Sequence, residues 1–118
     1  MMSWQEELNS KRLKTKGWYG CIAPDGWQKI VEETDAMLAH IDPDYEIHQI
    51  KEKFGTLRYY FGTTHASDTI EYKIMSAIER AAEARSAGVC EVCGQWGETD
   101  WDRSYVRTLC EEHNEEKE

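Results

Sequence analysis

Apolar residues recur at helical spacing in two segments of the chain, residues 27–41 and residues 69–86. In the first segment they are Trp27, Ile30, Val31, Leu38 and Ile41. In the second segment they are Ile70, Ile74, Ala77, Ile78 and Ala81. Each set falls on one side of a 3.6-residue spiral, so the pattern predicts two amphipathic helices whose apolar faces cover a core.

Three helix starts carry the spacing of a capping box, in which a short polar side chain accepts an orphan N–H and a residue three positions later reaches back. The pairs are Ser3 with Glu6, Asp25 with Gln28, and Asp68 with Glu71. The first pair predicts an additional N-terminal helix that ends near Lys16, because Gly17 follows.

Residues 45–61 contain two β-prone runs around Phe54-Gly55, which predicts a hairpin. With the turn at these two residues, one face carries the pairs Ile50–Tyr59, His48–Phe61 and Glu52–Leu57. The opposite face carries Gln49, Lys51, Lys53, Arg58 and Tyr60. We expect the first face to pack under the helices.

Two pairs of candidate metal ligands stand near the C-terminus. Cys90-Glu-Val-Cys93-Gly94 has the spacing of a zinc knuckle, and Cys110-Glu-Glu-His113 follows after sixteen intervening residues. Three thiolates and one imidazole complete a tetrahedral Zn²⁺ site and leave no position for a catalytic water. We therefore expect one structural zinc ion in a treble-clef-like module.

Two other uses of these cysteines do not fit the sequence. A zinc deaminase requires His-x-Glu upstream, whereas His65 is followed by Ala66-Ser67. A thioredoxin-like Cys-x-x-Cys follows a strand, whereas Cys90 follows a predicted helix. Cys21 has no nearby base in a nucleophile pattern, and we interpret it as a small buried residue.

Together these patterns predict an α+β fold, with helices packed on a hairpin-based antiparallel sheet and a zinc module at the C-terminus. We divide the chain into an N-terminal helical arm (1–24), an α+β body (25–87) and a zinc-binding module (88–118). The module and the body are expected to form one compact unit, because 118 residues are too few for two independent cores.

Charge narrows the classes of partner. The net charge is −9, and residues 21–50 carry one base against seven acids. Such a surface repels phosphate, so nucleic-acid binding is disfavoured although the basic hairpin and first helix keep it possible. No apolar run is long enough for a membrane span, and no signal-peptide pattern opens the chain. We expect no membrane partner and a cytoplasmic location.

The outer hairpin face gathers Lys51, Lys53, Arg58 and Tyr60, with Lys51 predicted opposite Arg58. Like charges that face one another weaken a hairpin, and such a conflict is typical of a functional site. Two interpretations stay open: the bases bind an anionic partner, or acids of the same chain, such as Glu32, Glu33 or those near Glu115, neutralise them.

Trp96 and Trp101 lie between the two ligand pairs. They either recognise a partner or cement the zinc loop onto the helices. No set of His, Asp or Glu residues converges in a catalytic pattern, so we expect a chain without enzymatic activity.

The segment Lys51-Glu-Lys-Phe-Gly55-Thr-Leu-Arg58-Tyr-Tyr60, together with Cys90-Glu-Val-Cys93-Gly94 and Arg107-Thr-Leu-Cys110-Glu-Glu-His113, resembles a group of small uncharacterised phage and prophage proteins. The resemblance covers residues 45–113. It implies the same body and a phage-type genomic context, which would place the protein in the cytoplasm of a host cell, and it implies no activity. We expect a binding protein that recognises another protein, such as a host or regulatory factor.

Overall fold

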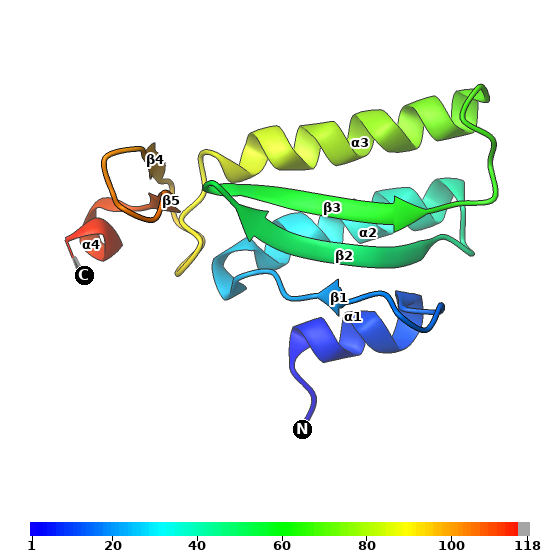
Figure 1. Ribbon diagram of the computed structural model, residues 1–118, viewed down its shortest axis with the longest axis horizontal. Helices are drawn as coiled ribbons and strands as arrows, with labels where there is room; N and C mark the ends of the chain where they lie inside the picture. The colour runs from blue at the N-terminus through cyan, green and yellow to red at the C-terminus, as the bar shows by residue number, and fades with distance from the viewer. Residues whose placement is uncertain (116–118) are drawn as a thin grey trace.

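The computed structural model describes residues 1–115 of the 118-residue chain and confirms an α+β fold (Figure 1). Its elements, in chain order, are α1 (Trp4–Arg12), β1 (Gly20–Cys21), the short 3₁₀ helix η1 (Asp25–Trp27), α2 (Gln28–Ile41), β2 (Glu46–Lys53), β3 (Thr56–Gly62), α3 (Ile70–Ser86), β4 (Glu98–Asp100), β5 (Arg107–Leu109) and α4 (Glu111–Asn114). The bounds proposed above for an arm, a body and a module stay predictions.

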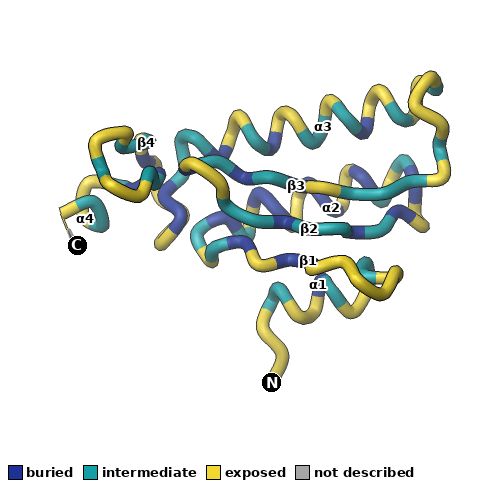
Figure 2. The backbone as a smooth tube through the Cα atoms, viewed as in Figure 1, coloured by how far each residue is buried: buried dark blue, intermediate teal, exposed yellow. Residues whose placement is uncertain are grey.

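The main sheet has three strands in the order β1-β2-β3. Strand β2 pairs antiparallel with β3, as the hairpin pattern predicts, and parallel with β1. Helix α2 lies behind the strands, and α3 runs along the β3 edge, where it also packs against α2 (Figure 1). The core between them is fully buried (Figure 2) and includes Trp27, Val31, Leu38, Ile47 and Leu57.

The β2–β3 turn has the predicted position. Phe54 (φ 54°) and Gly55 (φ 84°) are both left-handed, which is the backbone of the two-residue turns that match strand twist. The predicted pairs Ile50–Tyr59, Lys51–Arg58 and Glu52–Leu57 are confirmed.

The predicted pairing of His48 with Phe61 is wrong. The register shifts between Ile47 and Gln49, so Ile47 stands opposite Phe61 and His48 is an extra residue in the strand. This bulge lets the fully buried Ile47 occupy the core position. His48 instead stacks on Trp18, with ring centroids 4.1 Å apart.

Helices cover both edges of this small sheet. At the β1 edge, Asn9 Oδ1 of α1 accepts the Cys21 N–H (2.8 Å). At the β3 edge, Ser86 Oγ of α3 accepts the Leu57 N–H (2.8 Å). Unpaired strand edges invite association with other chains, and these side chains occupy hydrogen-bonding groups that an added strand would use.

A buried polar cluster fastens α1 to the rest of the core. Arg12 Nε donates to Asp35 Oδ1 of α2 (2.9 Å), and its guanidinium lies 5.0 Å from the centre of the Tyr45 ring. The Tyr45 hydroxyl donates to Asp35 and lies 2.6 Å from the Tyr59 hydroxyl. The first helix is thus held by charge and hydrogen bonding as well as by buried Leu8.

Two of the three predicted caps differ from the structure. The Ser3–Glu6 capping box is present. Asp25 caps no helix, because its carboxylate accepts from Trp4 Nε1 (2.9 Å) in α1 instead. The third helix begins one residue later than predicted, with the Thr69 hydroxyl accepting the Tyr72 N–H.

The predicted buried face of α3 is wrong except at Ile78, which is half-buried and packs against the core. Ile70 and Ile74 are 71% and 47% exposed, whereas Met75, Ala82 and Ser86 are buried. The buried set includes small residues that let α3 approach the β3 edge closely enough for the Ser86 hydrogen bond. Packing against this edge therefore rotates the Ile70–Ala81 stripe away from the sheet.

Within residues 1–115 no helix combines the length and apolar character needed to cross a membrane.

Replacing Arg12 by Ala should lower the free energy of unfolding by about 3 kcal/mol, because it leaves the Asp35 carboxylate buried without its cation. Urea unfolding measures the loss. Lys11→Ala, an exposed change in the same helix, should cost less than about 0.5 kcal/mol. A loss equal to that of the control would show that the ion pair does not fasten α1.

Candidate metal centre and sheet surface

The first ligand pair lies in a tight backbone turn between residues 89 and 96. Gly94 N–H donates to Cys90 O (2.9 Å), and Cys90 N–H donates to Gln95 O (2.7 Å). Gly94 has φ 82°, a left-handed conformation that a side chain would strain. A bridge between Val89 and Trp96 closes the turn, so Cys90 and Cys93 point to the same side.

The second pair lies at the start of α4. Cys110 is the N-cap residue, and Asn114 N–H donates to its carbonyl (2.9 Å). His113 therefore stands one turn further on the same helix. The order of knuckle, β4–β5 hairpin and helix is compatible with the treble clef expected from the sequence.

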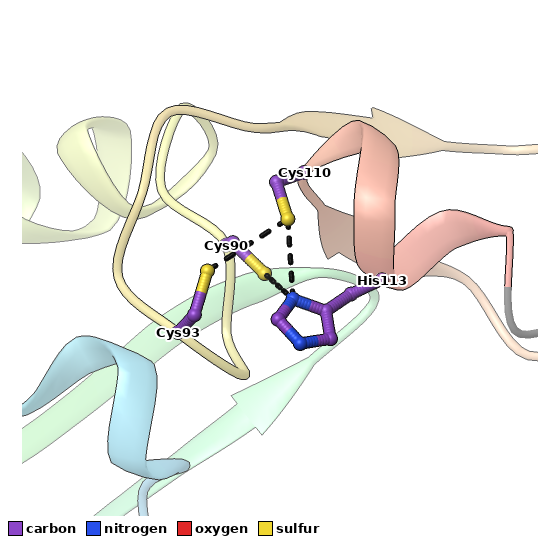
Figure 3. A group of neighbouring side chains, drawn as sticks. All are labelled: Cys90, Cys93, Cys110 and His113. Atoms are coloured by element: carbon purple, nitrogen blue, oxygen red, sulfur yellow. Dashed lines mark hydrogen bonds between the residues drawn. The ribbon is translucent and has the colours of Figure 1, made fainter.

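The four predicted ligands come together (Figure 3). Their ligand atoms all lie within 4.8 Å of one another, close enough to hold one metal ion. Cys93 Sγ lies 3.7 Å from Cys110 Sγ, and Cys90 Sγ lies 3.6 Å from His113 Nδ1. A tetrahedral ion with metal–sulfur bonds of about 2.3 Å requires edges of about 3.8 Å. These residues fit such an ion.

The electrostatics of the cluster favour a cation. Although burial alone raises the pKa of Cys90, the N–H groups of Cys110, Cys93 and Val92 lower this pKa to about 6. The sulfurs of Cys110 and Cys90 raise the pKa of His113 above its usual value. Thiolates crowded at this distance repel one another unless a positive charge lies between them.

The knuckle packs directly on η1. A Cβ atom on Gly26 would lie 2.2 Å from Cys90 O and 2.5 Å from the carbonyl carbon of Glu91. Gly26 N–H donates to Glu91 O (2.8 Å), and Trp27 Nε1 donates to Val89 O (2.8 Å). The backbone that carries the first ligand is thus fixed to the start of α2.

A second contact joins the metal-binding segment to the β2–β3 turn. Thr108 Oγ1 of β5 donates to Gly55 O (2.6 Å) and lies 2.7 Å from Thr99 Oγ1 of β4. A side chain at Gly55 would meet Thr99 Cγ2 at 3.0 Å. The turn that ends the basic hairpin is therefore held against the β4–β5 hairpin.

Lys51, Lys53, Arg58 and Tyr60 lie on the face of the sheet that α2 and α3 leave uncovered. Within residues 1–115, none of the three bases forms a salt bridge. Of the acids expected to neutralise them, Glu33 pairs with Arg85 (2.6 Å) and Glu32 accepts from Gln28. The acids that follow Glu115 lie outside the described residues. The Arg58 Nε atom is buried without a hydrogen-bond partner in this part of the chain.

A cleft of about 700 Å³ extends from Lys51 to the metal-binding segment. Its lining residues are Ile22, Pro24, Lys51, Glu52, Glu91, Tyr105 and Arg107. Arg107 Nε pairs with Glu91 (2.7 Å), which is buried, while the Tyr105 hydroxyl donates to Glu52 (3.3 Å). No local pattern in the sequence predicts the cleft, because its walls come from four segments that are distant along the chain.

Trp96 and Trp101 are 73% and 68% exposed. They do not cement the zinc loop onto the helices, and a role for them in recognition stays a prediction. Trp18 and His48 form a stacked aromatic pair, and His48 lies on β2, the strand that also carries Lys51. The chain matches no protein-family model, and no curated protein or solved structure matches it either.

Replacing Gly26 by Ala should destabilise the protein by about 2 kcal/mol, because the new methyl group meets rigid backbone rather than a movable side chain. The matched control is Gly88→Ala, where the nearest atom to the added Cβ would be 3.8 Å away. The melting temperatures of both variants, measured by thermal unfolding, check the predicted loss of stability. Equal melting temperatures would contradict close packing of the knuckle on η1.

Proposed function

We propose that the chain is a non-catalytic binding protein, stabilised by one Zn²⁺ ion, that recognises another protein through the uncovered face of its sheet. Three thiolates and an imidazole at tetrahedral distances suit zinc better than the oxygen-preferring cations. With all four positions filled by side chains, a bound ion has no site for water or substrate and stabilises the structure only.

The observation that carries the binding role is the cross-strand pair Lys51–Arg58, neither member of which forms a salt bridge in the described residues. Glu79 of α3 interacts with Arg58 electrostatically without forming a salt bridge. Two cations side by side destabilise a strand pair slightly, and an acidic ligand would relieve that cost. The neighbouring cleft supplies apolar and hydrogen-bonding walls through Ile22 and Tyr105. Such a surface suits an acidic segment of a partner protein.

The resemblance to phage and prophage proteins adds a context to this proposal. A protein from that setting would meet host or regulatory factors, and we infer that the partner belongs to this class. Trp96 and Trp101 would extend the contact from the sheet to the metal-binding segment, since exposed tryptophans are enriched in interfaces.

Single-stranded nucleic acid is the second candidate ligand. The stacked Trp18–His48 pair and Tyr60 offer aromatic surfaces on the hairpin that carries Lys51 and Arg58, which is the composition of base-stacking platforms. The net charge of −9 disfavours nucleic-acid binding, because the rest of the protein surface repels phosphates.

The zinc proposal predicts about one zinc per chain after purification under reducing conditions. Elemental analysis by mass spectrometry measures this ratio. Cys93→Ala and Cys110→Ala should lose the metal, whereas Cys21→Ala, which alters a buried cysteine outside the cluster, should retain it. A metal content near zero in the reduced wild-type protein would refute the proposal.

Affinity capture with mass spectrometry tests the binding surface. Lys51→Glu/Arg58→Glu should lose one reproducible partner that wild type retains. The matched control is Lys11→Glu/Lys29→Glu, which makes the same charge change at exposed positions of α1 and α2. The control should retain that partner.

If both double variants capture the same proteins as wild type, the sheet surface is not the binding site. A low-salt gel-shift series with single-stranded DNA and RNA distinguishes the second candidate. Binding that weakens steeply with salt and is lost in Lys51→Glu/Arg58→Glu would replace the protein partner by nucleic acid.

A further inference from the structure

An apolar stripe on α3 faces solvent, away from the sheet. Its members are Ile70, Ile74, Ala77 and Ala81, of which Ile70 and Ile74 are 71% and 47% exposed. Their spacing alternates between four and three residues, which is the seam pattern by which one helix receives another. Burial of apolar area is the main driving force for association, so an exposed seam indicates an interaction surface.

The stripe forms one wall of a shallow groove against α2. Met37 of α2, 46% exposed, lies across from it, and the groove volume is about 420 Å³. The groove is lined by Met37, Ile70, Lys73, Ile74, Ala77, Ile78 and Ala81. Lys73 is the sole charged side chain of this lining, so the groove fits the apolar face of an amphipathic helix.

The charged residues beside the groove determine which kind of helix can bind in it. Lys73 and Arg80 both flank the seam on the side away from α2, and neither forms a salt bridge within residues 1–115. Arg80 donates to the Ser76 hydroxyl (2.8 Å) instead. On the other flank, Arg85 is already paired with Glu33 of α2. The open flank is therefore positive in a chain of net charge −9.

A second copy of the chain fits this flank poorly. In an antiparallel pair of α3 helices, Lys73 and Arg80 would face the same two cations of the other copy. In a parallel pair, Arg80 would face Arg85. Flanking charges set partner choice in paired helices, so either arrangement disfavours self-association.

We propose that the α2–α3 groove binds an amphipathic helix of another protein, whose apolar seam covers Ile70, Ile74, Ala77 and Ala81 and whose acidic residues face Lys73 and Arg80. This surface is separate from the uncovered face of the sheet. The proposal therefore does not depend on Lys51, Arg58 or the metal, and its failure would leave the proposed function standing.

A synthetic helix tests the groove directly. The probe is a fluorescently labelled peptide of about three heptads with leucine at the seam positions and glutamate at the flanking positions. A control peptide carries lysine in place of every flanking glutamate. Fluorescence anisotropy with the full-length, metal-loaded protein should show the acidic peptide binding about tenfold more tightly than the basic one.

Three variants identify the surface. Ile74→Lys should abolish binding, whereas Met2→Lys, the introduction of the same charge at an exposed apolar position outside the groove, should leave it unchanged. Lys73→Glu/Arg80→Glu should reverse the preference toward the basic peptide. Circular dichroism confirms that each variant remains folded.

Two results would overturn the proposal. One is the absence of saturable binding of the acidic peptide, or equal binding of both peptides to wild type. The other is a wild-type dimer in sedimentation equilibrium that Ile74→Lys dissociates, because a second copy would then be the occupant of the groove.

Discussion

The smallness of the sheet determines much of the architecture. Three strands, one of them only two residues long, cannot bury a core by themselves, so the helices must cover one face and both edges. Asn9 and Ser86 satisfy edge N–H groups, and the Arg12–Asp35–Tyr45 cluster holds the first helix where Asn9 can do so. The opposite face of the sheet stays uncovered. It carries Lys51 and Arg58, which form no salt bridge in the part of the chain that the structure describes.

The metal ligands and the hairpin could be predicted because both are local in the sequence. Ligand spacing fixes which side chains can reach one ion, and Phe54-Gly55 fixes the turn and hence the Lys51–Arg58 pair. Whether acids of the same chain neutralise the basic face could not be predicted, because the answer depends on where Glu33 lies in the folded structure. Strand β1 was missed for a similar reason, since two residues carry no periodicity.

Two predictions failed where tertiary contacts overrode a local pattern. Strict alternation along β2 places His48 on the same face as the buried Ile50. The bulge puts Ile47 in the core position instead, because burial of the isoleucine side chain is more favourable than burial of the histidine ring. The Ile70–Ala81 stripe is the stronger apolar face of α3, but close approach to β3 requires the small residues Ala82 and Ser86 on the inner side. A helix whose best apolar face points outward is better explained by an external contact than by the fold.

The contact between Gly26 and the knuckle links metal occupancy to the shape of the cleft. Glu91 stands between ligands Cys90 and Cys93 in the chain, and its carbonyl anchors Gly26 while its carboxylate holds Arg107 in the cleft wall. Loss of the ion would release the backbone that fixes both groups. Under the proposed zinc-binding and recognition roles, metal supply would set how many copies display a formed cleft, so the ion would control the amount of competent protein without taking part in recognition.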